Sequence, residues 1–304
     1  MSAVSIPTSM RAIRLHAPGG LAELVEERVD TPSPREGEAL VRVHAAAITR
    51  DELDWPADRL PAIPSYELSG VVAAVGPHVD DLTVGDSVYA LADFERDGAA
   101  AEYAVVAAEL LAPKPQALGH AESAAVPLAA LSAWQGLFDH GKLAGGERVL
   151  VHGAAGGVGS FAVQLARHRG AHVIGTASTS GLDTARELGA AEVVDRTKAR
   201  FEEAVDPVDL VFDTAGGELL ERSPAILRDG GRLVSVAEKP SGDGVYFIVE
   251  PNREQLAEIG RLADSGELRA LVDSVFPLGE AREAFERSMQ PGKRGKVVLR
   301  VVDD

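Results

Sequence analysis

The pattern of apolar and polar residues changes near residue 120 of the chain. Before that point, short apolar segments alternate with stretches that contain Gly and Pro. Residues 38–48, EALVRVHAAAI, alternate well enough to predict a half-buried strand. The pattern predicts further strands at 10–15, 68–75, 87–92 and 102–106. The N-terminal part of the chain is therefore expected to be mostly β.

The second half of the chain has the alternation of an α/β protein. Residues 122–141, ESAAVPLAALSAWQGLFDHG, are rich in Ala and Leu and predict a helix. Apolar strands then alternate with helical periods, and we expect the strands at 149–153, 172–177, 192–195, 208–214, 231–237 and 245–250. Such alternation predicts a parallel sheet covered by helices on both faces. One more amphipathic helix is expected at 252–265 and a last strand within 294–301.

Length and composition limit the classes of function. A chain of 304 residues with 45% hydrophobic residues is long enough for two domains. The net charge of -17 argues against nucleic acid and anionic membranes as partners. No cationic segment followed by a long apolar one opens the chain, so we expect a soluble, cytoplasmic protein. The absence of cysteine excludes disulfides, thiolate catalysis and cysteine-bound zinc.

A glycine-rich turn joins the strand at 149–152 to a helix predicted at 160–169. Its glycines, Gly153, Gly156 and Gly159, have GxxGxxG spacing within the stretch HGAAGGVG. Glycine permits a tight strand-to-helix turn and a close approach of the backbone to a pyrophosphate, and the N–H groups of the helix N-terminus then face the phosphate oxygens. A purely structural β-α turn is the alternative. Because a second strand at 172–177 completes the β-α-β unit, we predict a dinucleotide site that includes Ala155, Gly157 and Val158.

The end of the second strand favours NADP(H) over NAD(H). An NAD site usually carries Asp or Glu there to bind the ribose 2′-OH, but this chain reads GTASTSG over 175–181. The hydroxyl of Ser178 and its neighbours would meet a 2′-phosphate without repulsion. Arg196, at the end of the next strand, is either the cation for that phosphate or an ordinary surface arginine.

The chain resembles the medium-chain dehydrogenase/reductase superfamily, in its zinc-free quinone oxidoreductase branch. The resemblance covers nearly the whole chain, and its most specific elements are AAGGVG with the upstream GERVLVHG, the downstream LGA, and YELSGVVAAVG at 66–76. It implies an α/β fold in which a Rossmann doubly wound parallel sheet is inserted into a GroES-like β-rich domain. We therefore expect a GroES-like catalytic domain at 1–125 and 267–304 and a Rossmann domain at 126–266, with an active-site cleft between them.

The resemblance also bears on zinc. Zinc-dependent relatives carry a catalytic Cys in the segment that matches AAAITRDEL, and a Gly-His-Glu where this chain has Ser65-Tyr66-Glu67. Both ligand positions are lost here, and the four-Cys structural lobe has no counterpart between Gly85 and Tyr103. We therefore expect no metal site. Without a Lewis acid, the expected chemistry is direct hydride transfer from NADPH to a quinone or to the activated C=C of an α,β-unsaturated carbonyl.

Such a reaction needs a donor for the oxygen that becomes negatively charged. Tyr66 is one candidate, because it stands where zinc-dependent relatives place a metal ligand, and an aromatic packing role is its alternative. Thr49 is the second candidate, aligned with a polar residue that zinc-free relatives keep near the nicotinamide. Relatives often have Asn-Pro where this chain has Thr49-Arg50.

The resemblance implies further cofactor contacts on both predicted domains. In the Rossmann domain they come from a helix, from the loop after the strand LVFDT and from residues flanking the nicotinamide. In the tail they come from the segment KRGK. The residues are Ser132, Thr214, Ala215, Val236, Phe247, Arg294 and Lys296. Each has a structural alternative as helix surface, core or a solvated turn.

The apolar strand VYFIV at 245–249 is expected at the edge of the Rossmann sheet, where an unpaired strand is a liability. The family pairs this edge across a two-fold axis, so we expect a homodimer. Two other functions remain open. One is an enoyl or tailoring reductase for a larger natural product, and the other is a nucleotide-binding redox sensor or structural protein without turnover.

Overall fold

The structure is a computed structural model that describes residues 6–55 and 58–302. The chain forms two compact units. Unit 1 contains the residues up to Pro127, Pro251–Asp264, and the residues from Val272 onward. Unit 2 contains Leu128–Glu250 and Ser265–Leu271. Within the described ranges, no helix is long and apolar enough to cross a membrane.

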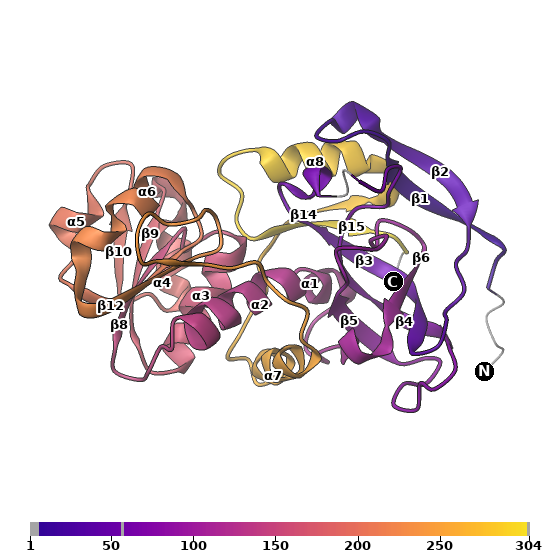
Figure 1. Cartoon of the computed structure of the whole chain (residues 1–304), viewed down its shortest axis with the longest axis horizontal. Coiled ribbons are helices and arrows are strands. Elements are labelled where there is room, and N and C mark those ends of the chain that lie inside the picture. The colour runs from indigo at the N-terminus through magenta and orange to yellow at the C-terminus, as the bar shows by residue number, and fades with distance from the viewer. Residues whose placement is uncertain (1–5, 56–57, 303–304) are drawn as a thin grey trace. The chain divides into compact units, whose positions relative to one another are not determined.

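Unit 1 is the β-rich unit (Figure 1). Strands β1 and β2 form an antiparallel hairpin, and a seven-stranded sheet has the order β14-β15-β3-β4-β5-β7 with β6 also paired to β3. The strands are β1 (Ser9–Leu15), β2 (Leu24–Asp30), β3 (Glu38–Ile48), β4 (Glu67–Val75), β5 (Ser87–Leu91), β6 (Tyr103–Ala107), β7 (Ala112–Pro113), β14 (Val272–Pro277) and β15 (Lys296–Arg300). Its helices are α1 (His120–Ala124), α7 (Arg253–Asp264) and α8 (Ala281–Met289).

The core of unit 1 explains why the long strand β3 lies centrally. Leu40, Val41 and Val43 are buried in one apolar cluster that also takes in Leu299 of β15 and Phe285 of α8. The C-terminal part of β3 is alanine-rich, and these small side chains form a second cluster with the alanines of α1. The C-terminal strand β15 pairs antiparallel with β3, so the two ends of the sequence are held in one sheet.

Unit 2 is the predicted doubly wound sheet. Six parallel strands have the order β10-β9-β8-β11-β12-β13, which is the order 3-2-1-4-5-6 of a Rossmann fold. The strands are β8 (Arg148–His152), β9 (His172–Ala177), β10 (Glu192–Asp195), β11 (Val208–Asp213), β12 (Leu227–Ser235) and β13 (Val245–Tyr246). The helices are α2 (Pro127–Trp134), whose first residue belongs to unit 1, α3 (Gly157–His168), α4 (Leu182–Leu188), α5 (Phe201–Ala204) and α6 (Gly217–Arg222). The predicted fold class is confirmed: a Rossmann sheet is inserted into a GroES-like β domain.

Two helical segments differ from the sequence prediction. The single helix expected at 122–141 is divided into α1 and α2, which begins at Pro127, because proline lacks the N–H that would continue the hydrogen-bond ladder. The helix expected at 252–265 forms as α7, but it packs in unit 1 and not in the Rossmann unit.

Contacts along α7 explain this correction to the predicted boundary at residue 266. The Tyr89 hydroxyl donates to the carbonyl of Leu256, and the Ala117 N–H donates to Asp264 at 2.9 Å. The segment returns to unit 2 only after α7, where the Arg269 N–H donates to Gln164 at 2.9 Å. The buried face of α7 thus completes unit 1.

Candidate functional site

The glycine-rich turn connects β8 to α3 in unit 2. Gly153 has φ of 74°, a left-handed conformation that favours glycine, and Gly156 is extended at the helix N-cap. The first hydrogen bond of the helix runs from the Ser160 N–H to the Gly156 carbonyl at 3.0 Å. The N–H groups of 157–159 therefore precede the helical ladder, in the position where a helix N-terminus binds anionic oxygens.

The third glycine of the turn is required by close packing. A Cβ at Gly159 would lie 2.1 Å from the carbonyl oxygen of Gly153 and 2.7 Å from its carbonyl carbon. A Cβ at Gly153 would lie 2.7 Å from Oγ1 of Thr214. The helix thus approaches the strand end more closely than a side chain would allow, as expected for a dinucleotide-binding turn.

The loop after β11 lies next to this turn, because β8 and β11 are neighbours at the point where the strand order reverses. The Thr214 hydroxyl donates to the carbonyl of His152 at 2.7 Å and so joins the two strand ends. Asp213 is fully buried and accepts hydrogen bonds from the N–H groups of Ala215 and Gly216 at 3.1 Å and from the Ser235 hydroxyl at 2.8 Å. Burial raises the pKa of Asp213. Ligands of open α/β sheets bind at this reversal point.

The region predicted to select the nucleotide combines hydroxyls with one acid that the sequence analysis did not consider. The hydroxyls of Ser178 and Ser180 are 3.2 Å apart. Asp195 ends β10, pairs with Ala177 of β9, and accepts the Thr179 hydroxyl at 2.6 Å. Hydrogen bonds from Thr179 and then Thr197 hold the pKa of Asp195 well below its usual range. Asp195 is thus ionised but already bound by hydroxyl groups.

Arg196 follows this carboxylate directly. Its N–H donates to the carbonyl of Ala177 at 3.0 Å, so its backbone is fixed at the end of β9. Its side chain is exposed. The backbone of Arg196 thus lies next to Ala177, the residue before Ser178, and a contact of its side chain with a 2′-phosphate stays a prediction.

The remaining cofactor candidates of unit 2 lie on three different elements. Ser132 is buried on α2, and Val236 follows β12 with its N–H bonded to the Asp213 carbonyl at 3.1 Å. Phe247 is 8% exposed and packs against His140 with ring centroids 4.4 Å apart. Of these, Val236 is directly tied to the reversal point through Asp213. Nucleotide contacts of all three stay predictions.

Tyr66 does not have the accessibility expected of a proton donor. Its side chain is 0% exposed and packs between Trp55 and Phe94, with ring centroids at 5.7 and 5.4 Å. Its hydroxyl accepts a hydrogen bond from Arg59 at 3.2 Å, and burial raises its pKa. These contacts fit the alternative role of Tyr66 as a packing residue, and the donor role stays a prediction.

Thr49 and Lys296 meet in unit 1. The Lys296 ammonium donates to Oγ1 of Thr49 at 2.9 Å and forms an ion pair with the carboxylate of Glu67. The Thr49 hydroxyl lies 3.3 Å from Glu67 Oε1 and is half-buried, whereas Lys296 and Glu67 are buried. Lys296 was predicted to contact the cofactor, but here its ammonium is engaged by Thr49 and Glu67.

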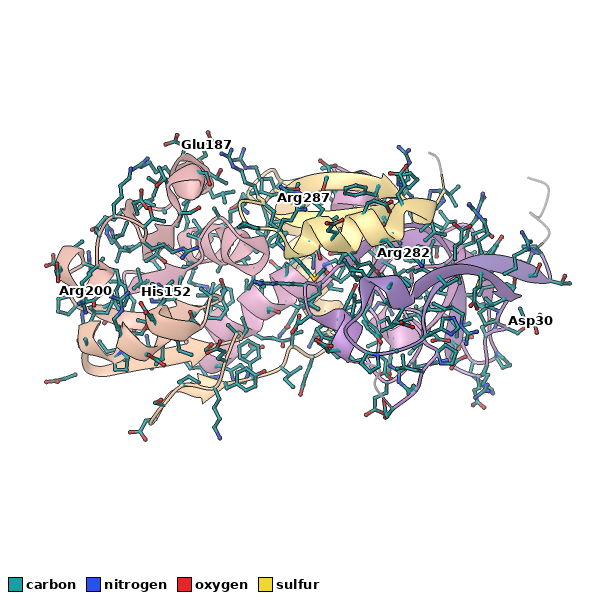
Figure 2. All side chains as sticks on the ribbon, turned by 90° about the horizontal axis from the view of Figure 1, so that it is seen from above. Asp30, His152, Glu187, Arg200, Arg282 and Arg287 are labelled. Carbon is teal, nitrogen blue, oxygen red and sulfur yellow. The ribbon has the colours of Figure 1, made fainter. Side chains whose placement is uncertain are left out.

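Arg294 lies two residues before Lys296, and its N–H donates to Asp273 at 2.9 Å. The same carboxylate accepts two hydrogen bonds at 2.8 Å from the guanidinium of Arg287, labelled beside α8 in Figure 2. The backbone of the KRGK turn is therefore anchored to β14. A contact of the Arg294 side chain with the cofactor stays a prediction.

The sequence analysis missed two groups near Thr49. Glu52 is 1% exposed and accepts the Ser65 hydroxyl at 3.4 Å, and burial raises the pKa of its carboxyl well above the usual range. Lys293 is bonded to the Ser288 carbonyl, and burial, assisted by the charges of Lys296 and Arg50, lowers its pKa to about 8. Neither had a sequence signal beyond proximity to the Thr49 and KRGK segments.

The donor groups present do not fit zinc. The sequence contains no cysteine, and among residues 6–55 and 58–302 no group of three or more His, Asp or Glu side chains is arranged to hold a metal ion. Where zinc-dependent relatives carry a zinc ligand, this chain has Tyr66, whose hydroxyl accepts a hydrogen bond from Arg59.

Comparison with known proteins agrees with this fold. Residues 35–116 match the family described as alcohol dehydrogenase GroES-like domain, and residues 188–299 match zinc-binding dehydrogenase. A probable zinc-binding oxidoreductase, mitochondrial, of Arthroderma benhamiae is 34% identical over 99% of this chain and 99% of that protein. The NADPH-dependent alkenal/one oxidoreductase, chloroplastic, of Arabidopsis thaliana is 34% identical over 97% of this chain and 80% of that protein. The structure of the quinone oxidoreductase from Coxiella burnetii has a TM-score of 0.91 at 30% identity and covers 97% of this chain and 100% of that one.

The fold, the glycine turn and these relatives define the class as nucleotide-binding dehydrogenases and reductases. The chain belongs to the medium-chain dehydrogenase/reductase superfamily, in its zinc-free quinone oxidoreductase branch.

Proposed function

We propose that the chain is a reductase that uses NADPH, without zinc, to transfer hydride to a quinone or to the activated C=C of an α,β-unsaturated carbonyl. The observation that carries this proposal is the tight glycine turn at Gly153 and Gly159, at the start of α3. In addition, the described residues contain no group of side chains that could bind zinc. The names of the Arabidopsis and Coxiella relatives support the two substrate classes.

The residues of unit 2 have separable tasks in this proposal. The N–H groups of 157–159 hold the pyrophosphate at the start of α3, and Ser178 and Arg196 hold the 2′-phosphate. When bound, the nicotinamide nucleotide supplies the hydride. In unit 1, the hydroxyl of the half-buried residue Thr49 donates a hydrogen bond to the substrate oxygen that becomes negatively charged, because Tyr66 is buried.

NADPH oxidation by the purified protein tests the function. A panel of quinones and enones is supplied in the presence of a chelator, with NADPH and NADH binding titrated in parallel. We expect tight NADPH binding and turnover that the chelator does not reduce. Turnover that is lost with chelator and restored by Zn²⁺ would disprove the zinc-free mechanism. NADPH binding without oxidation by any member of the panel would favour a redox sensor.

Arg196→Ala should weaken NADPH binding and leave NADH binding unchanged. A charge-assisted contact to the 2′-phosphate contributes about 1.5–3 kcal/mol, which corresponds to about 10- to 150-fold in Kd. Lys198→Ala is the matched control, because this neighbouring cation already forms an ion pair with Asp195 at 3.5 Å. Equal losses for both nucleotides in Arg196→Ala would contradict NADP(H) selection by Arg196.

We further propose that two copies of the chain pair through the edge of the Rossmann sheet. The edge strand β13 is short, yet Val245, Tyr246 and Ile248 are 39%, 43% and 68% exposed. Ile248→Asp should therefore convert a dimer into a monomer in light scattering. Val84→Asp is the control, since Val84 is an equally apolar residue that is 60% exposed in unit 1. A wild-type protein that is monomeric at micromolar concentration would contradict the dimer.

A further inference from the structure

Three neighbouring strand ends bring Thr49, Glu67 and Lys296 together. Thr49 follows the last residue of β3, and β15 begins at Lys296, with Val297 paired to Ile48 of β3. On the other side of β3, the first residue of β4, Glu67, pairs with Ala47. The register of this sheet therefore places one hydroxyl, one carboxylate and one ammonium side by side, although Lys296 and Thr49 are 247 residues apart in sequence.

The hydrogen bonds within this cluster have a defined direction. An ammonium can only donate, so Oγ1 of Thr49 is the acceptor of the 2.9 Å bond from Lys296. The hydroxyl proton of Thr49 must then point elsewhere, and its partner within the cluster is Glu67 Oε1 at 3.3 Å, a long contact. A hydroxyl whose oxygen already accepts from a cation is a stronger donor, because bonds in such a chain polarise one another.

The three residues of the cluster differ in how much of each is exposed to solvent. Glu67 and Lys296 are 1% and 7% exposed, whereas Thr49 is half-buried, so Thr49 is the most exposed residue of the three. Glu52 is also buried near them, and burial raises the pKa of its carboxyl well above the usual range. The ion pair of the cluster is the one between Lys296 and Glu67.

We propose that Lys296 is a positioning residue that orients and polarises the Thr49 hydroxyl, so that Thr49 donates a hydrogen bond to the substrate oxygen on which negative charge develops, while Glu67 fixes Lys296. This rests on the proposed function. With an enone, hydride from the bound dinucleotide would form the new C–H bond at the β-carbon while the π electrons move onto the carbonyl oxygen, and water would then supply one proton. With a quinone, the same hydride and proton would end as the two O–H bonds of the hydroquinone. Thr49 and Lys296 keep their own protons throughout.

A double-mutant cycle tests whether Lys296 acts through Thr49. The first change is Thr49→Val, which removes the hydroxyl at nearly constant shape. The second is the combined change Lys296→Met and Glu67→Gln, which removes both buried charges together so that neither is left unpaired. Loss of one oxyanion donor costs about 100- to 1,000-fold in kcat, so we expect a loss of about 100-fold for Thr49→Val. The charge-pair variant should lose at least about 10-fold, and the triple variant should be no slower than Thr49→Val alone.

Two controls separate orientation from structure. Thr49→Ser keeps the hydroxyl and should retain most of kcat, and all variants should bind NADPH as the wild type does, because the nucleotide turn belongs to unit 2. If the charge-pair variant does not fold, Lys296→Gln replaces it, since its amide still donates to Thr49 but carries no charge. Its loss of kcat should then disappear in the Thr49→Val background.

The outcomes distinguish this inference from the function on which it rests. Losses that multiply in the triple variant, or a charge-pair variant with wild-type kcat, would overturn the role of Lys296 in an enzyme that still reduces its substrate. If the wild-type protein fails to oxidise NADPH with every quinone and enone tested, the proposed function itself is overturned. A drop confined to KM, with kcat unchanged, would show ground-state binding and overturn the polarised-donor role.

Discussion

Gly159→Ala is expected to abolish nucleotide binding. The added Cβ would lie 2.1 Å from the carbonyl oxygen of Gly153 and 2.7 Å from its carbonyl carbon, distances that real Cβ contacts do not reach. Both contacts are with backbone, so the start of α3 must move away from the strand end, and the N–H groups at 157–159 move with it. We expect the Kd for NADPH to rise at least about 100-fold, equivalent to about 2.7 kcal/mol.

Gly156→Ala is the matched control within the same turn. A Cβ there would meet the same Gly153 oxygen at 3.1 Å, which a shift of a few tenths of an ångström relieves. Calorimetric titration with NADPH measures both variants, and thermal unfolding shows whether each is folded. Gly156→Ala should keep a Tm close to that of the wild type. Wild-type affinity in a folded Gly159→Ala would show that the turn does not hold the nucleotide.

The glycine turn could be predicted from sequence because its requirements are local. A strand, three spaced glycines and a helix lie within one short segment, and the positive φ of Gly153 and the crowding at Gly159 are consequences of that segment alone. The parallel sheet of unit 2 was predictable for a similar reason, since a helix follows each strand from β8 to β11.

The interior of unit 1 could not be predicted in this way. The burial of Tyr66 depends on Trp55 and Phe94, and the Lys296 ion pair joins strands from opposite ends of the chain. A sequence pattern shows that Tyr66 occupies a ligand position of zinc-dependent relatives, but it does not show which side chains surround its ring and hydroxyl. The packing of α7 on unit 1 likewise depends on distant partners such as Tyr89.

His152 is expected to make the protein lose stability as the pH falls below about 6.5, the ordinary pKa of histidine. The ring is 0% exposed within unit 2, where Figure 2 labels it, with Nδ1 3.0 Å from the Thr176 hydroxyl and Nε2 3.0 Å from the Ser223 hydroxyl. Ser223 donates its own proton to the Leu219 carbonyl, so it accepts from Nε2–H, and Nδ1 accepts from Thr176. Both ring nitrogens are thus satisfied only in the neutral form.

The sign of the pH dependence follows from the lowered pKa. Burial, with a smaller contribution from the charge of Arg222, lowers the pKa of His152 to about 3 in the folded state. Above about pH 6.5 neither state binds a proton at this residue, but below it the unfolded chain does and the folded chain does not. The free energy of unfolding should therefore fall by up to about 1.4 kcal/mol for each pH unit between about 6.5 and 3.

Urea unfolding from pH 7.5 to pH 4.5 measures this contribution by comparing the wild type with His152→Gln. The variant keeps one amide partner for Ser223 but loses the bond to Thr176 and the ring contact with Phe201, so it should be less stable at pH 7.5 by about 1–3 kcal/mol. Its stability should nevertheless fall less steeply than that of the wild type, because the titrating group is absent. His78→Gln, at a side chain 78% exposed, should leave the wild-type slope unchanged. Equal slopes for the wild type and His152→Gln would mean that the buried ring takes up its proton without unfolding.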